Sequence, residues 1–403
     1  MFDFETGSTI AFLLLLAVLV VIDRKNIEFK YGVMIRRTQK GKRLIYDVGK
    51  KYKNVFKKIG TVGVFVAVIA SFVVLYFLWN SAYSILTHPE KAEPGVRFII
   101  PEIPSEVACK YALCVPFWYW ILGILTVLFS HELMHAFIAR AENIKIDSFG
   151  VLSFLVLPGA FVEPDEKQLR KSKSSTKLKI YAAGSFGNLI IVAISTLLIL
   201  ASLFAVNTFI KGAGVNFEST VLGTPANKTG LYGTIIEVDN QPIKDLGDFI
   251  DAMNKTKPGD EMKIKTECCA YSLKAMENPS DPTKPYIGIQ NATTKFVFTG
   301  FLKGFGEVSS ITLEAIDWIV NLFLWLNFLN LGVGMINLLP LKPLDGGLIF
   351  EEIFKMIFKK RFSPYLINAL SAFTFVLLAI NVIGPYLVGP ITSVFLISKF
   401  LTG

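Results

Sequence analysis

The chain has 403 residues, of which 52% are hydrophobic and 13% aromatic, and its formal net charge is +9 at pH 7. This length allows two or three domains, and the hydrophobic content excludes an ordinary soluble protein, because several runs approach the ~20 apolar residues that cross a bilayer. The positive charge is concentrated in a few loops, which is typical of membrane topology and which a nucleic-acid-binding face would not need. The four cysteines do not have the spacing of a metal finger, and no disulfide pairing can be deduced from them.

The N-terminal part predicts two membrane spans. The short apolar segment Ile10 to Ile22 is followed by basic residues, the reverse of the order in a cleaved signal peptide. We therefore expect a retained first span whose C-terminal end faces the cytosol. Arg24 to Lys58 is densely basic and predicts a cytosolic loop, Gly60 to Leu86 predicts the second span, and His88 to Val115 predicts an external loop.

The third predicted span, Pro116 to Ala139, carries His131-Glu132-Leu133-Met134-His135 toward its far end. On a helix this HExxH pattern places two imidazoles on one face with the glutamate between them, an arrangement that holds zinc and offers its bound water a carboxylate. Two buried histidines satisfied by their neighbours are the alternative, which is weaker because polar groups at membrane depth are costly and usually functional. Counting crossings from the basic loop places this end of the span near the cytosolic face.

The stretch that follows, Ile144 to Glu166, is too short to cross as a helix and is interrupted by proline and glycine. It contains Leu157-Pro158-Gly159-Ala160-Phe161-Val162. Strand-like backbone at membrane depth is tolerated only where it is buried in protein or lines a wet cavity. We expect a re-entrant β-hairpin beside the metal site, whose open edge could pair with an extended segment of another chain. An amphipathic surface hairpin is the alternative.

The fourth predicted span, Ile180 to Val206, opens with Gly184-Ser185-Phe186-Gly187-Asn188. Small residues there let helices approach closely. Asn188 is costly inside a span unless it has a partner or a task, and a packing role is as plausible as a catalytic one.

A polar segment from Asn207 to about Thr294 separates the fourth and fifth spans. Asp239-Asn240 predicts a tight turn between strands, and Asp245 to Asn254 predicts a helix. The segment therefore predicts a small external domain, and all Asn-x-Thr sequons fall in or just after it, at Asn227, Asn254 and Asn291.

The fifth predicted span, Ile311 to Leu339, runs into a break that contains two prolines and ends in Asp345-Gly346-Gly347. Prolines cannot continue a regular helix, and the glycine pair permits an unusual backbone. Asp345 is a candidate third metal ligand, because spans three and five both end on the cytosolic side. Four other acidic residues compete for this role: Glu142, Glu163, Asp165 and Glu166.

The rest of the chain predicts an amphipathic interfacial helix, Ile349 to Phe362, and an apolar segment, Ser363 to Leu401, interrupted at Gly384-Pro385. We interpret this last segment as one span and a second, for about seven crossings. The predicted parts are 1–115 with the N-terminal spans, 116–206 as the first catalytic half, 207–300 as the external domain, 301–362 as the second catalytic half, and 363–403 as the C-terminal spans.

This combination resembles the site-2 protease family of intramembrane zinc metalloproteases. The matching patterns are HExxH at His131–His135, GxxxN at Gly184–Asn188, and Asn337-Leu338-Leu339-Pro340 with Leu344-Asp345-Gly346. Leu157 to Val162 is similar to the family's re-entrant β-hairpin, in which Gly159, Ala160 and Phe161 would hold the substrate strand. Ser219 to Ile289 is similar to a PDZ-type domain. The resemblance implies Asp345 as third ligand, and Asn188 and Asn337 as residues that position substrate or stabilise the oxyanion.

The sequence therefore predicts a polytopic α-helical protein of the cell membrane, with a re-entrant β-hairpin and a small external α+β PDZ-like domain. We expect an intramembrane zinc endopeptidase that hydrolyses peptide bonds within transmembrane segments of membrane-anchored substrates, as in regulated intramembrane proteolysis. Glu132 would be the general base, Zn²⁺ the cofactor, and a peptide or protein a partner of the PDZ-like domain.

Two other functions compete with this expectation. A non-catalytic zinc-binding membrane protein or metal transporter would need polar residues spaced through several spans, whereas here they cluster at one depth. A different HExxH membrane protease, acting on prenylated tails, usually takes glutamate as its third ligand.

Overall fold

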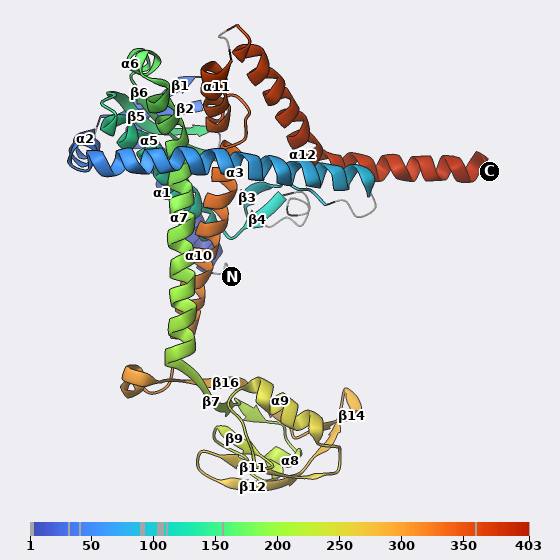
Figure 1. The fold of residues 1–403 in the computed structure, drawn as a ribbon. Helices are drawn as coiled ribbons and strands as arrows, with labels where there is room; N and C mark the ends of the chain where they lie inside the picture. The colour runs from blue at the N-terminus through green and yellow to red at the C-terminus, as the bar shows by residue number, and fades with distance from the viewer. Residues whose placement is uncertain are drawn as a thin grey trace. The chain divides into compact units, whose positions relative to one another are not determined.

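The computed structural model describes all residues except 1–3, 31–32, 40–41, 89–92, 103–108, 110–111, 155–156, 359–360 and 403. Figure 1 labels its helices and strands. The chain divides into two compact units, one made of residues 1–196 and 322–403, the other of residues 197–321.

Six helices in the described residues are long and apolar enough to cross a membrane. They are α1 (Phe4–Asp23), α3 (Lys53–Thr87), α5 (Phe117–Ala141), α7 (Ser174–Phe209), α10 (Ser310–Asn337) and α12 (Ser363–Thr402). The expected count of about seven is not confirmed, because α12 continues through Gly384 and Pro385 as one helix. Proline is tolerated in membrane helices where neighbouring groups satisfy the carbonyl that it frees.

The first unit also contains a four-stranded antiparallel sheet in the order β1-β2-β5-β6. Its strands are β1 (Glu28–Lys30), β2 (Val33–Thr38), β5 (Ile146–Phe154) and β6 (Leu157–Pro164). The last two form the hairpin that the sequence predicted. The basic segment expected to be a cytosolic loop contains β1 and β2, two strands that the sequence did not predict. The apolar start of β2 pairs along β5, from Val33 opposite Phe154 to Thr38 opposite Phe149.

Shorter elements complete this unit: η1 (Arg24–Asn26), α2 (Lys42–Lys51), β3 (Phe98–Pro101), β4 (Ala112–Val115), α6 (Glu166–Lys171) and α11 (Asp345–Ile357). Strands β3 and β4 form a parallel pair. Cys114 of β4 forms a disulfide with Cys109, which the spacing did not predict.

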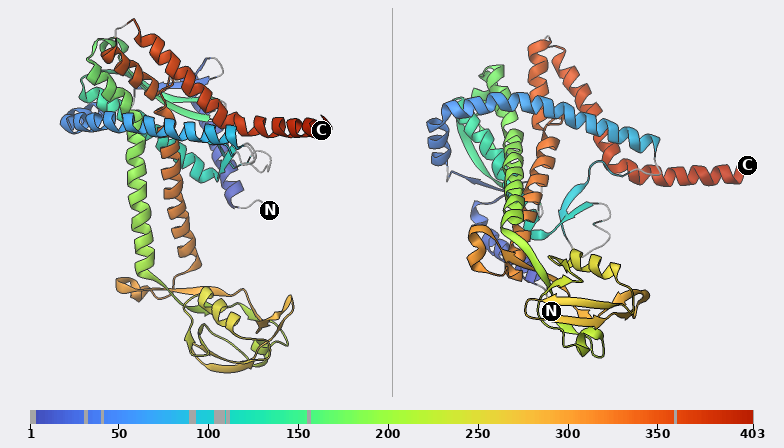
Figure 2. Two further views of the ribbon diagram at one scale, coloured as in Figure 1. Left: turned by 45° about the vertical axis from the view of Figure 1, so that its right-hand side comes forward. Right: turned by 60° about the horizontal axis from the view of Figure 1, so that its bottom comes forward.

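Close helix contacts hold the first unit together. A Cβ placed on Gly187 of α7 would lie 2.6 Å from the Ser130 carbonyl of α5, so only glycine permits this approach. In the same unit α7 and α10 run side by side (Figure 2), and Asn327 of α10 donates to the Val192 carbonyl of α7 at 3.0 Å. Buried residues of α5 and α7, among them Ile138, Ala139 and Ile180, form one apolar cluster.

The second unit is built around a sheet in the order β12-β11-β9-β7-β16, with β10 paired to β9. Its elements are β7 (Ile210–Asn216), β8 (Ser219–Thr220), α8 (Pro225–Lys228), β9 (Ile235–Val238), β10 (Gln241–Pro242), α9 (Leu246–Lys255), β11 (Glu261–Thr266), β12 (Ala270–Lys274), β13 (Met276–Asn278), β14 (Asp281–Tyr286), β15 (Ile289–Gln290), β16 (Thr293–Phe298) and η3 (Gly300–Phe305).

Local sequence explains these elements. Met262, Ile264 and Thr266 are buried at alternate positions of β11, as a half-buried strand requires. The Asp245 carboxylate caps α9 by accepting from the Asp248 amide. Asp239 and Asn240 both have positive φ, at 47° and 64°, which confirms the predicted tight turn.

The break after α10 is tied to α3 by a buried serine, which generates a first prediction. The Ser71 hydroxyl lies 2.7 Å from the Leu338 carbonyl and 2.8 Å from that of Ala67. Ser71→Ala should lower the free energy of unfolding in detergent by about 0.5–2 kcal/mol, because it leaves the Leu338 carbonyl unpaired. Thermal unfolding measures the change.

Thr61→Ala is the control on the same helix, since Thr61 is exposed and, among the residues that the structure describes, its hydroxyl bonds only the Lys57 carbonyl of its own helix. This variant should change the free energy by less than about 0.5 kcal/mol. Equal losses in the two variants would contradict the structural role of Ser71.

Candidate metal centre

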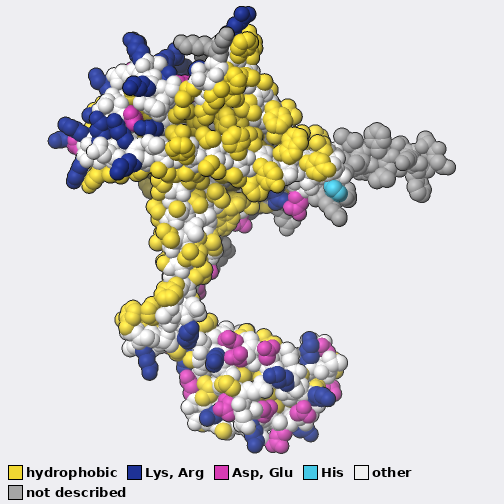
Figure 3. Space-filling view, in the orientation of Figure 1, with side chains coloured by type: hydrophobic (Ala, Val, Ile, Leu, Met, Phe, Trp, Pro, Cys, Tyr) yellow, Lys and Arg dark blue, Asp and Glu magenta, His cyan; other side chains and the backbone are white. Residues whose placement is uncertain are grey.

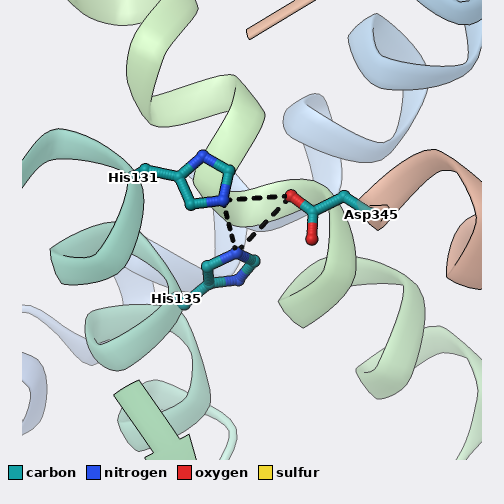
Figure 4. A group of neighbouring side chains, drawn as sticks. All are labelled: His131, His135 and Asp345. Atoms are coloured by element: carbon teal, nitrogen blue, oxygen red, sulfur yellow. Dashed lines mark hydrogen bonds and ion pairs between the residues drawn. The ribbon is translucent and has the colours of Figure 1, made fainter. Parts of the chain in front are cut away.

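Helix α5 brings the two motif histidines together. The four-residue spacing from His131 to His135 places both imidazoles on one face of the helix. Their Nε2 atoms lie 3.2 Å apart, and the rings meet edge to face with centroids 4.8 Å apart. The Nε2 atoms of both histidines therefore point to one place beside the helix (Figure 4).

Asp345 reaches the same place from the first residue of α11 (Figure 4). Its Oδ2 lies 3.4 Å from His131 Nε2 and 3.5 Å from His135 Nε2. The Ser185 hydroxyl of α7 donates to the same oxygen at 3.1 Å. The side chains of His131, His135 and Asp345 are only 13%, 16% and 14% exposed, so the three donor atoms meet at a point that is largely shielded from solvent.

The glycine pair after Asp345 has a different role from the one expected. Gly346 and Gly347 lie inside α11, not in an irregular backbone. A Cβ on Gly346 would lie 2.2 Å from the Leu338 carbonyl oxygen, and one on Gly347 would lie 2.7 Å from the backbone of Leu341. The glycines therefore let the first turn of α11 pack directly on the broken segment, which holds Asp345 against the histidines.

The donor set fits zinc. The three donor atoms lie 3.2, 3.4 and 3.5 Å from one another. In a tetrahedral site with zinc bonds of about 2.0–2.1 Å, ligand atoms lie about 3.3 Å apart. Two imidazole nitrogens and one carboxylate oxygen are also a ligand set found in catalytic zinc sites, which keep a fourth position for water or substrate. The described residues contain one such group of three potential ligands.

Gly184 keeps the position between these ligands free. A Cβ on this residue of α7 would lie 2.3 Å from His135 Nε2 and 2.5 Å from His131 Nε2. Those distances are close to the zinc bond length of about 2.0–2.1 Å, so the methyl group of an alanine would stand where the metal would. The sequence predicted close packing here; the direct conflict with a metal could be found only from the distances.

A backbone contact orients His135. Its Nδ1 lies 2.7 Å from the Ile180 carbonyl of α7, which accepts the Nδ1 proton. The proton on Nδ1 leaves Nε2 with a free lone pair toward the site, as is usual for metal-binding histidines.

The two predicted asparagines differ in their placement. Asn188 is fully buried, and its side-chain nitrogen lies 3.5 Å from His131 Nδ1. Asn337 is the last residue of α10 and is half-buried. Within the described part of the chain its side chain makes no hydrogen bond. The structure thus brings Asn188, but not Asn337, into contact with the histidine pair.

Glu132, between the two histidines in the sequence, lies beside the hairpin. The Glu132 carboxylate faces the backbone N–H of Val162 in β6. Gly159, Ala160 and Phe161 precede Val162 in the same strand, paired with Leu152, Val151 and Gly150 of β5. The glutamate between the two histidines is therefore next to the strand that carries the predicted substrate residues.

The four competing acidic residues have partners elsewhere. Glu142 pairs with Lys179 at 3.0 Å, and Glu163 with Arg37 at 3.5 Å. Asp165 accepts from the Gln168 amide at the start of α6. Glu166 pairs with Arg170 at 3.1 Å. In the described residues, the metal-competent group contains Asp345 and none of these four.

Comparison with known proteins agrees with this centre. The profile of peptidase family M50 matches residues 119–381. An uncharacterized protein of Methanocaldococcus jannaschii is 28% identical over 83% of this chain and 82% of its own length. A "Putative zinc metalloprotease" of Clostridium perfringens is 23% identical over 64% of this chain and 93% of its own length. The "Probable protease eep" of Enterococcus faecalis is 25% identical over 50% of this chain and 56% of its own length.

The steric role of Gly184 generates a prediction. Gly184→Ala should reduce bound zinc to about one-tenth or less of the wild-type content, because its methyl group would occupy the metal position. Metal analysis of the protein purified in detergent measures the content. Gly332→Ala is the matched control, since a Cβ on Gly332 meets nothing within 4 Å. A full zinc content in Gly184→Ala would contradict the assignment.

Proposed function

Because this chain belongs to peptidase family M50, the site-2 protease family, we propose that it is an intramembrane zinc endopeptidase. Its substrates would be membrane-anchored proteins, cut within a transmembrane segment. The observation that carries the proposal is the convergence of His131, His135 and Asp345 on one point, with Glu132 on the same helix as the histidines. Helices α5 and α7, which enclose this point, are long and apolar enough to cross a membrane.

We propose that His131, His135 and Asp345 bind Zn²⁺ through the two Nε2 atoms and Oδ2. Bound zinc polarises the scissile carbonyl and lowers the pKa of a coordinated water. The carboxylate supplies a negative charge that offsets part of the charge of the ion. Ser185 holds that carboxylate through the oxygen that faces the histidines.

Glu132 then moves the proton. It takes one proton from the attacking water, and the new C–O bond forms as the carbonyl carbon becomes tetrahedral. It returns the proton to the amide nitrogen as the C–N bond breaks, which leaves a carboxylic acid and an amine. Asn188 and Asn337 are the proposed side chains for positioning the substrate or stabilising the oxyanion, as the family resemblance implies.

Strand β6 is the proposed substrate platform. A peptide bond in a helix is hidden by its own backbone hydrogen bonds, so a transmembrane substrate has to unwind before it can be cut. In the order β1-β2-β5-β6, strand β6 has a paired neighbour on one side among the described strands. Its other edge can pair with an unwound substrate by strand addition, at Gly159, Ala160 and Phe161.

Charge supports a site near the cytosolic face. Lys and Arg side chains gather over α2 and α6 (Figure 3), as the positive-inside rule predicts for a cytosolic face. His135 lies six residues before the end of α5 and Gly184 ten residues after the start of α7, or about 9 and 15 Å along the helix axes. The proposed site therefore lies within about 15 Å of the ends of both helices on this side, measured along the helix axes.

The second unit is the proposed external PDZ-like domain. A hollow of about 450 Å³ lies on it, lined by Pro225 and Lys228 of α8, by Thr229, and by residues 272–276 from β12 to the start of β13. Such a hollow is suited to a peptide. The domain would act as a binding module or as a size filter that excludes substrates with bulky external parts.

A non-catalytic zinc protein or a metal transporter is the second candidate function. A transporter needs metal-binding groups at several depths, whereas the described residues contain one group of three potential ligands. An HExxH membrane protease with glutamate as third ligand is disfavoured by the position of Asp345. The protease proposal therefore accounts for more of the site.

The role of Glu132 separates catalysis from metal binding. Glu132→Gln should lower the rate of cleavage of a reconstituted membrane-anchored substrate at least about 100-fold, because an amide cannot accept the proton. Its zinc content should equal that of the wild type. Gel-based cleavage assays and metal analysis measure both quantities. Cleavage at the wild-type rate would exclude the mechanism.

The proposed topology can be tested with the two free, exposed cysteines, Cys268 and Cys269. A membrane-impermeant maleimide should label them in intact cells, because their domain is external. With both replaced by serine, a cysteine introduced at the exposed position Lys171 should be labelled only after the membrane is permeabilised. The opposite pattern would reverse the topology.

A further inference from the structure

We propose that Asn330 of α10 is a positioning residue for the metal site. It would fix the imidazole of His131 through a line of hydrogen bonds that passes through Ser130 and Asn188. The proposal rests on the proposed function in one respect, because it requires His131 to bind the metal through Nε2.

Three polar side chains from three helices form this line. Ser130 precedes His131 on α5, Asn188 lies on α7, and Asn330 lies on α10. Both asparagines are 0% exposed. The Ser130 hydroxyl lies 2.6 Å from the Asn188 side-chain oxygen and 3.3 Å from the Asn330 Oδ1. The other end of the Asn188 amide faces His131 Nδ1 at 3.5 Å.

The protons of the line can be assigned by requiring every donor to have an acceptor. A histidine that binds metal through Nε2 carries a proton on Nδ1 and needs an acceptor there. The oxygen and nitrogen of an asparagine amide exchange places by a half-turn. With the Asn188 oxygen toward His131, the Nδ1 proton has its acceptor. The Asn188 nitrogen then donates to the Ser130 hydroxyl oxygen, which is the atom 2.6 Å away.

Asn330 determines which groups donate and which accept along this line of hydrogen bonds. Its nitrogen donates to the Leu326 carbonyl at 2.8 Å, so its oxygen is the end that faces Ser130. That oxygen accepts the single Ser130 proton, which leaves the serine oxygen free to accept from Asn188. The alternative acceptor for Ser130 is the Val127 carbonyl at 3.2 Å, and choosing it would leave the buried Asn330 oxygen unpaired at a free-energy cost.

The line connects the two halves of the proposed active site. Asn330 belongs to the same helix that leads into the break before Asp345, whereas His131 belongs to α5. One hydrogen-bonded line therefore holds a ligand of the first half in a position set by the second half. Loss of such a supporting contact typically weakens metal binding about 10- to 100-fold.

Asn327 provides a matched control. It lies three residues earlier on α10 and also contacts α7, donating to the Val192 carbonyl at 3.0 Å and the Thr196 hydroxyl at 2.7 Å. Asn327→Leu and Asn330→Leu therefore both remove a polar contact between α10 and its neighbours. Only the second removes a contact in the line that reaches His131.

The experiment compares these variants as full-length protein in detergent. Zinc affinity is measured by competition with a chromophoric chelator, and the visible spectrum of the Co²⁺-loaded protein reports ligand geometry. Asn330→Leu should weaken zinc binding at least about tenfold and shift the Co²⁺ bands, whereas Asn327→Leu should stay within about twofold of wild type with unchanged bands. Wild-type affinity in Asn330→Leu, or equal losses in both variants, would overturn the proposal.

Ser130→Ala, which removes only a hydroxyl group, completes a double-mutant cycle with Asn330→Leu. It should weaken zinc binding about as much as Asn330→Leu, and the two changes combined should have no larger effect than either one, because each interrupts the same line. If Asn330→Leu does not fold, unchanged affinity in Ser130→Ala overturns the proposal and a loss of about tenfold supports it. Additive losses in the double variant would also overturn it.

The outcome for the wild type separates this proposal from the proposed function. A wild-type protein that binds zinc but cleaves no membrane substrate would contradict the protease function and leave the affinity test of Asn330 valid. A wild-type protein that does not bind zinc would overturn both.

Discussion

The structure depends on one geometric constraint: two nitrogens and one oxygen from distant parts of the chain have to meet at a single point that no other atom occupies. The three donor atoms lie 3.2–3.5 Å from one another, and Gly184 is the residue whose missing side chain leaves the point free. This close approach of α7 to α5 explains why glycine and serine stand where a membrane helix would otherwise carry larger residues. The same small residues therefore allow these helices to pack closely and leave room for the metal.

A broken helix satisfies the same constraint from the other half of the chain. Helix α10 ends at Asn337, and α11 starts at Asp345 with its glycine pair packed on the intervening backbone. Ser71 donates to the Leu338 carbonyl of that backbone and Ser371 to the Pro340 carbonyl, so both groups have partners away from water. The carboxylate is then held at the start of a helix, where the backbone dipole favours a negative charge.

Much of this site could be predicted because its chemistry is local in the sequence. The spacing of His131 and His135 determines their shared helix face, and the prolines before Asp345 mark a break in an apolar helix. The hairpin was predictable from proline and glycine in a segment too short to span. Its two additional strands were not, because the basic residues of β2 indicated a loop and only the pairing with β5 overrides that preference. The Cys109–Cys114 disulfide and the steric role of Gly184 depend on distances, which spacing does not determine.

X-ray absorption at the zinc edge of the purified wild-type protein tests whether His131, His135 and Asp345 together bind zinc. The proposed ligand set predicts one zinc ion per chain, bound by nitrogen and oxygen at about 2.0–2.1 Å with the scattering pattern of two imidazoles. It also predicts that Asp345→Asn loses the ion or changes its oxygen shell. Sulfur ligands at about 2.3 Å, or a spectrum unchanged in Asp345→Asn, would contradict it.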